Sequence, residues 1–262
     1  MIIDNKIGAV DAYALCKTLS RAPNLAITRF SGNPIPIQGR ARPKVYKISE
    51  NSQNHPVLTA PDPGALPRSR QHPYEAQLDA LEAVLCADTL TQSLGAAPLR
   101  SVTDLGLLLE RYRTTVLEPI ELPAILLAHR EAAQGRAVEL IELDRTFSGK
   151  HPEWLLLTPA STRVGRDYLN RLRPLQDERA VQRLIEAVRF GRTPGHHLTV
   201  FGLTMAVFSI AQRQGLAEYA QYALEAVVAT AAGTLQLTQT DRNQLLARSQ
   251  ARLPDAIERM VA

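Results

Sequence analysis

The fold depends on residues 195–246, which read GHHLTVFGLTMAVFSIAQRQGLAEYAQYALEAVVATAAGTLQLTQTDRNQLL. No charged residue occurs from Leu198 to Ala211, a stretch too short to span a membrane, which takes about 20 apolar residues. It has the length of a helix buried in the middle of a helical protein. We expect Gly215 to end this helix, because glycine readily adopts the left-handed conformation found at helix C-termini.

Two further helices are expected in the same stretch. The second has small side chains that allow a close approach to its neighbours, and Thr238-Gln-Thr-Asp241 has the spacing of a capping box at the start of the third. Three successive helices therefore form the predicted core. The apolar positions at helical spacing in the second helix are Leu216, Ala220, Ala223, Leu224, Val227, Val228 and Ala231.

The composition favours helices over a β-sandwich. Hydrophobic residues make up 45% of the 262 residues but aromatic residues only 5%, so Leu, Ala, Val and Ile must fill the core. Apolar periodicity and short connections predict an all-α fold, a single bundle of about nine helices over residues 74–262. Within it we expect Pro119 and Pro123 to separate two helices, and Pro159 and Pro254 to interrupt two others.

Residues 1–73 differ from the rest and are predicted to form an irregular, basic N-terminal arm. Nine of the chain's 17 prolines lie before residue 75, and proline disfavours regular helix. Residues 1–75 hold ten Lys and Arg against five Asp and Glu, whereas the remainder is nearly neutral. One short helix within residues 1–20 and one short strand, Lys44–Ile48, are the regular elements expected there.

Several function classes are disfavoured by what the sequence lacks. It contains no phosphate-binding loop, no G-x-S-x-G, no H-E-x-x-H and no C-x-x-C, so no enzyme is predicted. Cys16 and Cys86 give neither a metal motif nor a disulfide framework. The start lacks the plan of a signal peptide, and we expect a cytoplasmic protein without a membrane span. The net charge of +4 is a weak argument for nucleic-acid binding.

His196 and His197 form the one adjacent histidine pair. They are weak candidates for a metal or proton site, with a shared site across a dimer interface as one variant. The alternative is a polar start to the buried helix. Trp154, the only tryptophan, is either an interface anchor or a core residue. Asp104 and Asp241 each follow a Ser or Thr by three residues, which favours helix capping over a catalytic role.

A run of arginines lies between residues 163 and 192. It is either a docking surface for an acidic partner or a solvated helix face. Arg163, Arg166, Arg173 and Arg183 are the preferred contacts within this run. The complete run is Arg163, Arg166, Arg171, Arg173, Arg179, Arg183, Arg189 and Arg192.

The order of short motifs in the core stretch resembles the urease accessory protein UreF family. Gly195-His-His197 is followed by Val200-Phe201-Gly202, then by an alanine-rich helix, then by Thr238-Gln-Thr-Asp241 before a Leu-Leu pair. Upstream, Ala160-Ser161 before Gly165-Arg166 is similar to that family's A-S-x-x-x-G-R turn. With similar helix spacing further upstream, the resemblance covers about residues 76–260.

The resemblance implies an all-α, dimerising scaffold that is not an enzyme. Members bind a second accessory protein, UreD (also called UreH), and together recruit a GTPase, UreG, that hands nickel to apo-urease. It also implies that the chain binds no cofactor stably and that nickel is handled by the complex. The dimer or partner contacts implied are Ser161, Arg163, Gly165, Arg166, His197, Phe201, Gly202, Gln239 and Asp241.

The sequence also departs from the family pattern. The N-terminal signature L-P-x-G-x-[FY]-x-[YH]-S-x-G-L-E is absent, and Thr158, Gly233 and Arg242 replace residues that are usual in the family. Two other readings therefore stay open. One is a divergent paralogue that serves as a protein-interaction module outside urease maturation. The other is a nucleic-acid-binding protein that uses the basic arm and the arginine run, which the few aromatic residues disfavour.

Overall fold

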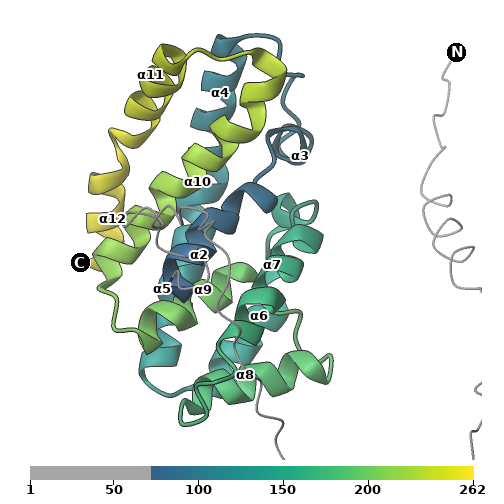
Figure 1. The fold of residues 1–262 in the computed structure, drawn as a ribbon, viewed down its shortest axis with the longest axis vertical. Helices are drawn as coiled ribbons and strands as arrows, with labels where there is room; N and C mark the ends of the chain where they lie inside the picture. Colours follow the sequence, from purple (N-terminus) through teal and green to yellow (C-terminus); the bar gives the residue numbers. More distant parts are fainter. Residues whose placement is uncertain (1–71) are drawn as a thin grey trace, which may run out of the picture. The chain divides into compact units, whose positions relative to one another are not determined.

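The computed structural model describes residues 72–262, where every regular element is a helix (Figure 1). The predicted all-α fold is thereby confirmed, whereas the expected N-terminal arm, with its short helix and strand, falls outside the described residues except at residues 72 and 73. In chain order the elements are α2 (Pro73–Asp79), η2 (Ala80–Ala83), α3 (Ala87–Ser93), α4 (Val102–Tyr112), η3 (Arg113–Glu121), α5 (Leu122–Ala133), α6 (Ala137–Lys150), η4 (Pro152–Trp154), α7 (Thr158–Arg171), α8 (Arg179–Arg189), α9 (His197–Val207), α10 (Gln212–Leu235), α11 (Gln239–Gln250) and α12 (Leu253–Val261).

The uncharged helix α9 lies at the centre of this unit, as its sequence predicts. All its side chains from His197 to Met205 are buried, and it packs most closely against α5 and next against α7. Figure 1 shows α4, α10 and α11 at one end and α6, α7 and α8 at the other. Among the described residues, no helix is both long and apolar enough to cross a lipid bilayer.

The close contact between α5 and α9 requires a glycine. A Cβ atom added to Gly202 would lie 2.6 Å from the carbonyl oxygen of Ile125 and 2.7 Å from the Cβ of Ala128. Both neighbouring atoms belong to backbone or to a short side chain, so neither can move away cheaply. Gly202 therefore sets the distance between the two most closely packed helices.

The prediction that Gly215 ends the buried helix is wrong. α9 ends at Val207 instead, with Phe208 as its C-cap, and the next residue, Ser209, adopts a left-handed φ of 55°. The Ile210 amide then bonds to the Met205 carbonyl oxygen at 2.9 Å, and the Ser209 amide to that of Ala206 at 3.2 Å. These two bonds define a Schellman motif with serine in the usual glycine position. Gly215 lies inside α10, buried against the Met205 side chain.

The expected break at Pro119 and Pro123 is also wrong. Residues 102–133 form one continuous helical run, because α4 passes through a π-helical segment, η3, into α5. The wider turns of a π segment shift the backbone hydrogen bonds, which lets the helix continue past Pro119. Pro123 is the second residue of α5 and lies inside the same continuous run.

Helix capping follows the sequence prediction. Thr238 and Asp241 form a reciprocal capping box at α11, and Ser101 accepts a bond from the Asp104 amide at the start of α4. Pro159 and Pro254 lie in the first turns of α7 and α12. They begin these helices rather than interrupt them, which corrects the expected breaks.

We expect Gly202→Ala to lower the free energy of unfolding by about 1–3 kcal/mol, because the new methyl group overpacks the α5–α9 contact. Gly233→Ala is the matched control within helix α10, since a Cβ there meets nothing within 4 Å. The control should gain about 0.5–1 kcal/mol from reduced chain entropy. Urea unfolding followed by circular dichroism measures both. Equal effects of the two substitutions would contradict the steric argument.

Candidate partner-contact site and its buried polar network

A single buried hydroxyl joins α7 to the start of α9. The Ser161 Oγ lies 3.1 Å from His196 Nδ1 and 2.9 Å from His197 Nδ1. Ser161 and His196 are both 0% exposed, and His197 is 4% exposed. His196 Nε2 reaches the Ser148 hydroxyl of α6 at 2.9 Å. The histidine pair therefore ties three helices together in the core.

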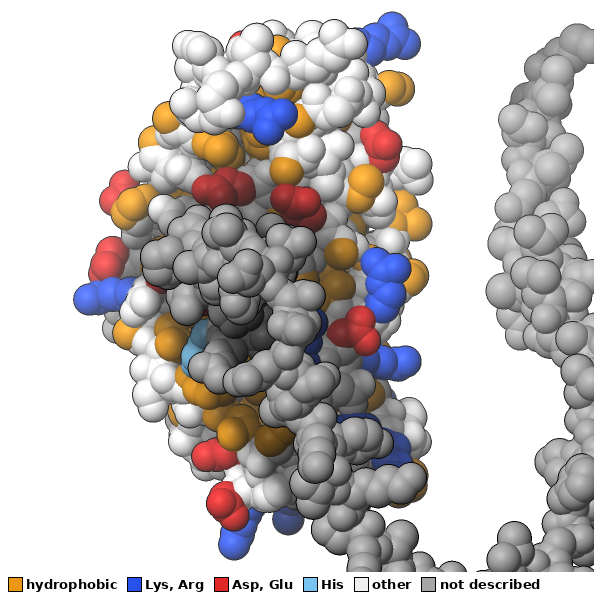
Figure 2. Space-filling model, viewed as in Figure 1, with side chains coloured by type: hydrophobic (Ala, Val, Ile, Leu, Met, Phe, Trp, Pro, Cys, Tyr) orange, Lys and Arg blue, Asp and Glu red, His pale blue; other side chains and the backbone are white. Residues whose placement is uncertain are grey.

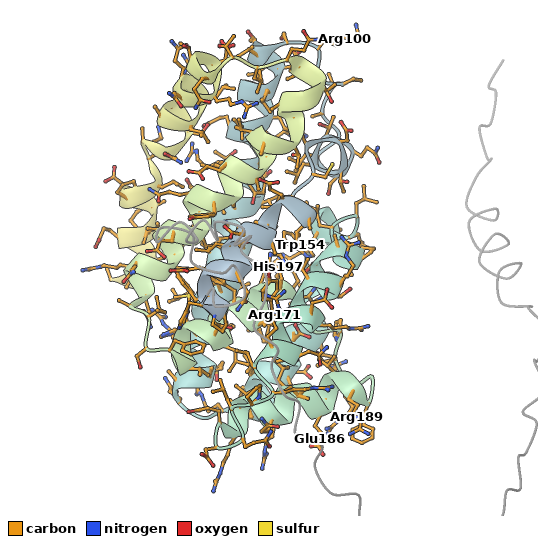
Figure 3. All side chains as sticks on the ribbon, viewed as in Figure 1. Arg100, Trp154, Arg171, Glu186, Arg189 and His197 are labelled. Carbon is orange, nitrogen blue, oxygen red and sulfur yellow. The ribbon has the colours of Figure 1, made fainter. Side chains whose placement is uncertain are left out.

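The network continues from His197 to a buried carboxyl group. His197 Nε2 lies 3.0 Å from the Tyr219 hydroxyl on α10, which donates to Glu121 Oε2 at 3.1 Å. The Tyr112 hydroxyl donates to the same oxygen at 2.7 Å. Tyr112 and Glu121 lie at the two ends of the π segment, so the irregular helix places them on one side. Trp154 stacks on His197 with ring centroids 5.8 Å apart, close to it in Figure 3, and is a core residue.

One arrangement of protons satisfies this chain with both histidines neutral. Tyr219 donates to Glu121 and accepts from His197 Nε2, so His197 Nδ1 accepts from Ser161. Ser161 in turn accepts from His196 Nδ1, and His196 Nε2 accepts from Ser148. In this arrangement Ser161 and Tyr219 each both donate and accept, with the ring proton of His197 on Nε2 and that of His196 on Nδ1.

Burial decides the ionisation of this network. Loss of solvent raises the pKa of Glu121 to about 8, although hydrogen bonds from Tyr112 and Tyr219 act in the opposite direction. Burial, with a smaller repulsion from His196, lowers the pKa of His197 to about 3. Burial also lowers the pKa of His196, against the attraction of Asp144. At neutral pH Glu121, His196 and His197 are therefore uncharged, so no unpaired ion is buried in this network.

Asp144 fixes the loop that precedes α9. Its carboxylate accepts from the Thr193 hydroxyl at 2.6 Å and from the backbone amides of Gly195 and His196 at 2.6 and 2.7 Å. The sequence prediction missed this residue. The signal was present, because Asp144 lies within the apolar stripe of α6, four residues after Leu140.

The A-S-x-x-x-G-R turn of α7 packs directly on this loop. A Cβ added to Gly165 would lie only 2.2 Å from the carbonyl oxygen of Gly195, so the two backbones touch. One residue later, Arg166 Nε donates to the Pro194 carbonyl oxygen at 2.7 Å while its side chain stays exposed. The turn thus joins a buried contact to an exposed charge within two residues.

The predicted contact residues separate into two sets by exposure. Arg163, Arg166 and Gln239 are exposed and Asp241 is half-buried. α11, which carries Gln239 and Asp241, lies away from α7 in Figure 1 and borders a groove of about 720 Å³ between α4 and α11. Partner contact by any of the residues stays a prediction. The buried set is Ser161, Gly165, His197, Phe201 and Gly202.

The two histidines do not have the geometry of a metal site in this fold. All four ring nitrogens lie within hydrogen-bond distance of protein hydroxyl groups. Within residues 72–262, moreover, no three or more His, Cys, Asp or Glu side chains cluster as metal ligands. The rings act as core residues that hold α9 against α7 and α10. The polar start that the sequence offered as the alternative is the arrangement found.

The Tyr219 hydroxyl should contribute measurably to stability, because it bridges His197 and Glu121 in the core. We expect Tyr219→Phe to lower the free energy of unfolding by about 1–3 kcal/mol, since it leaves two buried polar groups short of a partner. Tyr222→Phe on the same helix is the control, because Tyr222 is 39% exposed and its hydroxyl has no hydrogen bond within residues 72–262. Urea titration compares them, and equal losses would refute the bridging role.

Glu121 should make stability fall as the pH rises. In the unfolded chain it titrates near 4.5, so between pH 4.5 and 8 only the folded protein keeps the proton. The free energy of unfolding of wild type, relative to Glu121→Gln, should therefore fall by up to about 1.4 kcal/mol per pH unit across this window. His197 acts oppositely below pH 6.5, but both proteins share that effect. A difference independent of pH from 5 to 8 would contradict the assignment.

The comparisons with known proteins agree with this architecture. The family model described as UreF matches residues 99–250, which is more than half of the chain. This range contains every contact described above between α6, α7, α9 and α10. No curated protein sequence matches. UreF is a family of accessory proteins rather than of enzymes. The chain belongs to the UreF family of urease accessory proteins.

Proposed function

We propose that this chain is a scaffold for nickel insertion into apo-urease. In this proposal it acts with a UreD-like (UreH-like) accessory protein and a UreG-like GTPase, as a cytoplasmic homodimer. Nickel is the cargo of the complex, and the chain itself holds no cofactor stably. Family membership supports this role, together with a rigid surface on α7 from which Arg163 and Arg166 project.

The observation that carries the proposal is the contact between Gly165 and Gly195. This contact packs the A-S-x-x-x-G-R turn of α7 against the G-H-H loop. The exposed arginines of the turn therefore belong to a backbone segment that is held by buried contacts. A preorganised surface binds a partner at low entropic cost. A scaffold that contacts the GTP-bound and GDP-bound states of the GTPase differently would couple hydrolysis to metal transfer without any chemistry of its own.

A second candidate is a protein-interaction module outside urease maturation. The family match begins at residue 99, so α2, η2 and α3 lie outside it. The family's N-terminal signature is also absent, and Arg242 replaces its usual glycine. These departures favour a paralogue that kept the helical unit and exchanged its partners.

Co-expression separates the two candidates. We expect the chain to co-purify with the UreD-like and UreG-like proteins and the urease subunits of the same cell, with about two copies in the complex by size exclusion with light scattering. Deleting the chain should reduce both urease activity and the nickel content of purified urease. A folded helical protein that binds none of these partners, and whose deletion leaves the nickel content unchanged, would favour the second candidate.

A further inference from the structure

The exposed arginines of the run lie on two neighbouring helices, and we call this set the arginine face. Its members lie on α7, on α8 and in the segments that follow each helix, and the two helices pack against one another. In Figure 2 blue side chains are visible along the lower right side, where α7 and α8 lie, and Figure 3 labels Arg171 and Arg189 on these two helices. All eight are exposed: Arg163, Arg166, Arg171, Arg173, Arg179, Arg183, Arg189 and Arg192.

The arginine face concentrates positive charge on an otherwise acidic unit. Residues 160–192 carry eight Arg against four Asp and Glu, whereas the rest of residues 76–262 carries twelve Lys and Arg against seventeen Asp and Glu. This uneven distribution of charge is not needed for folding, because a surface of interspersed positive and negative charges is equally soluble. It produces a local positive potential that attracts an acidic partner.

Half of the eight arginines have a partner within the described part of the chain: Arg166 donates to Pro194, Arg192 pairs with Glu186, and Arg171 and Arg189 lie over the rings of Tyr168 and Phe190. The side chains of Arg163, Arg173 and Arg183 make no hydrogen bond or ion pair with residues 72–262. The ion pair on the face joins Arg192 to Glu186 at 3.8 Å, with both side chains more than half exposed, and contributes little. Each free guanidinium still offers its fork of donors to a carboxylate.

The neighbouring groups favour protein over nucleic acid as the occupant. Asp177 and Glu178 lie between α7 and α8, where they would repel the closely spaced phosphates of a duplex. A protein surface can place its carboxylates opposite the arginines and leave these two positions facing neutral groups. Phe190, at the end of α8, is 65% exposed and supplies an apolar anchor of the kind that protein interfaces use.

We propose that the arginine face docks a carboxylate-rich surface of a partner protein in the urease maturation assembly. The proposal rests on the proposed function for the identity of that assembly, but its charge chemistry comes from the face itself. The arginines select the acidic partner and speed its encounter, and Phe190 and the α7 backbone fix the docked orientation.

The experiment compares two triple variants of the full-length chain with equal charge. The face variant is Arg163→Glu, Arg173→Glu, Arg183→Glu. The control is Arg111→Glu, Arg130→Glu, Arg259→Glu, at three exposed arginines on other helices. Both should keep the circular dichroism spectrum of wild type. In the co-purified assembly, we expect the face variant to raise the Kd for its partners at least tenfold and the control less than threefold. The difference should shrink in 0.5 M salt.

The other outcomes distinguish a failure of the arginine face from a failure of the proposed function. If wild type assembles and both variants assemble equally well, the arginine face is not the docking surface, while the proposed function stands. If wild type binds none of the urease proteins, the proposed function fails. The arginine face is then tested separately, by measuring how strongly wild type and both variants bind poly-L-glutamate and a DNA duplex. A selective loss of poly-L-glutamate binding in the face variant supports acidic protein chemistry. Equal losses in both variants overturn it.

Two further results would assign the face to another occupant and overturn the proposal. A larger selective loss for the DNA duplex than for poly-L-glutamate would make it a nucleic-acid surface. A wild-type dimer that dissociates in salt, and that only the face variant abolishes, would make the second copy of this chain the occupant.

Discussion

The structure depends on the hydroxyl group of Ser161, which contacts both histidines at the start of α9. Because α9 carries no charge and is buried along most of its length, its polar start is the main place where hydrogen bonds can fix its position. Asp144 holds the preceding loop from α6, and Tyr219 holds His197 from α10. Four helices are thus placed by one short chain of hydrogen bonds.

This network is stable only because it is neutral. An ionised histidine or carboxylate at the same depth would need a counter-ion or several strong hydrogen bonds, such as the three that the Asp144 carboxylate accepts. Burial instead moves the pKa of Glu121 and that of His197 toward the uncharged form. The π segment contributes to the same network, because it connects Tyr112, the last residue of α4, to Glu121 without a break at Pro119. The irregular backbone therefore places the buried Glu121 carboxyl group where Tyr112 can donate to it.

The sequence predicts the helices well wherever local chemistry decides them. The uncharged run of α9 and the Thr238–Asp241 capping box are local signals, and both agree with the structure. The errors at Gly215 and Pro119 arose where tertiary packing overrode local preference, through a serine in the left-handed conformation and a π-helical turn. The partners of His197 could not be predicted, because Ser161 and Tyr219 are distant from it in the sequence and meet it only through packing.

The positive surface on α7 and α8 contains arginine and no lysine; the one lysine in residues 72–262 is Lys150, at the end of α6. A guanidinium group stays protonated throughout the biological pH range and is not acetylated as a lysine amine is. The charge of this surface therefore does not change with pH in the biological range, and amine-directed modification has no side chain to act on there. Amine-reactive reagents would therefore leave this surface unlabelled.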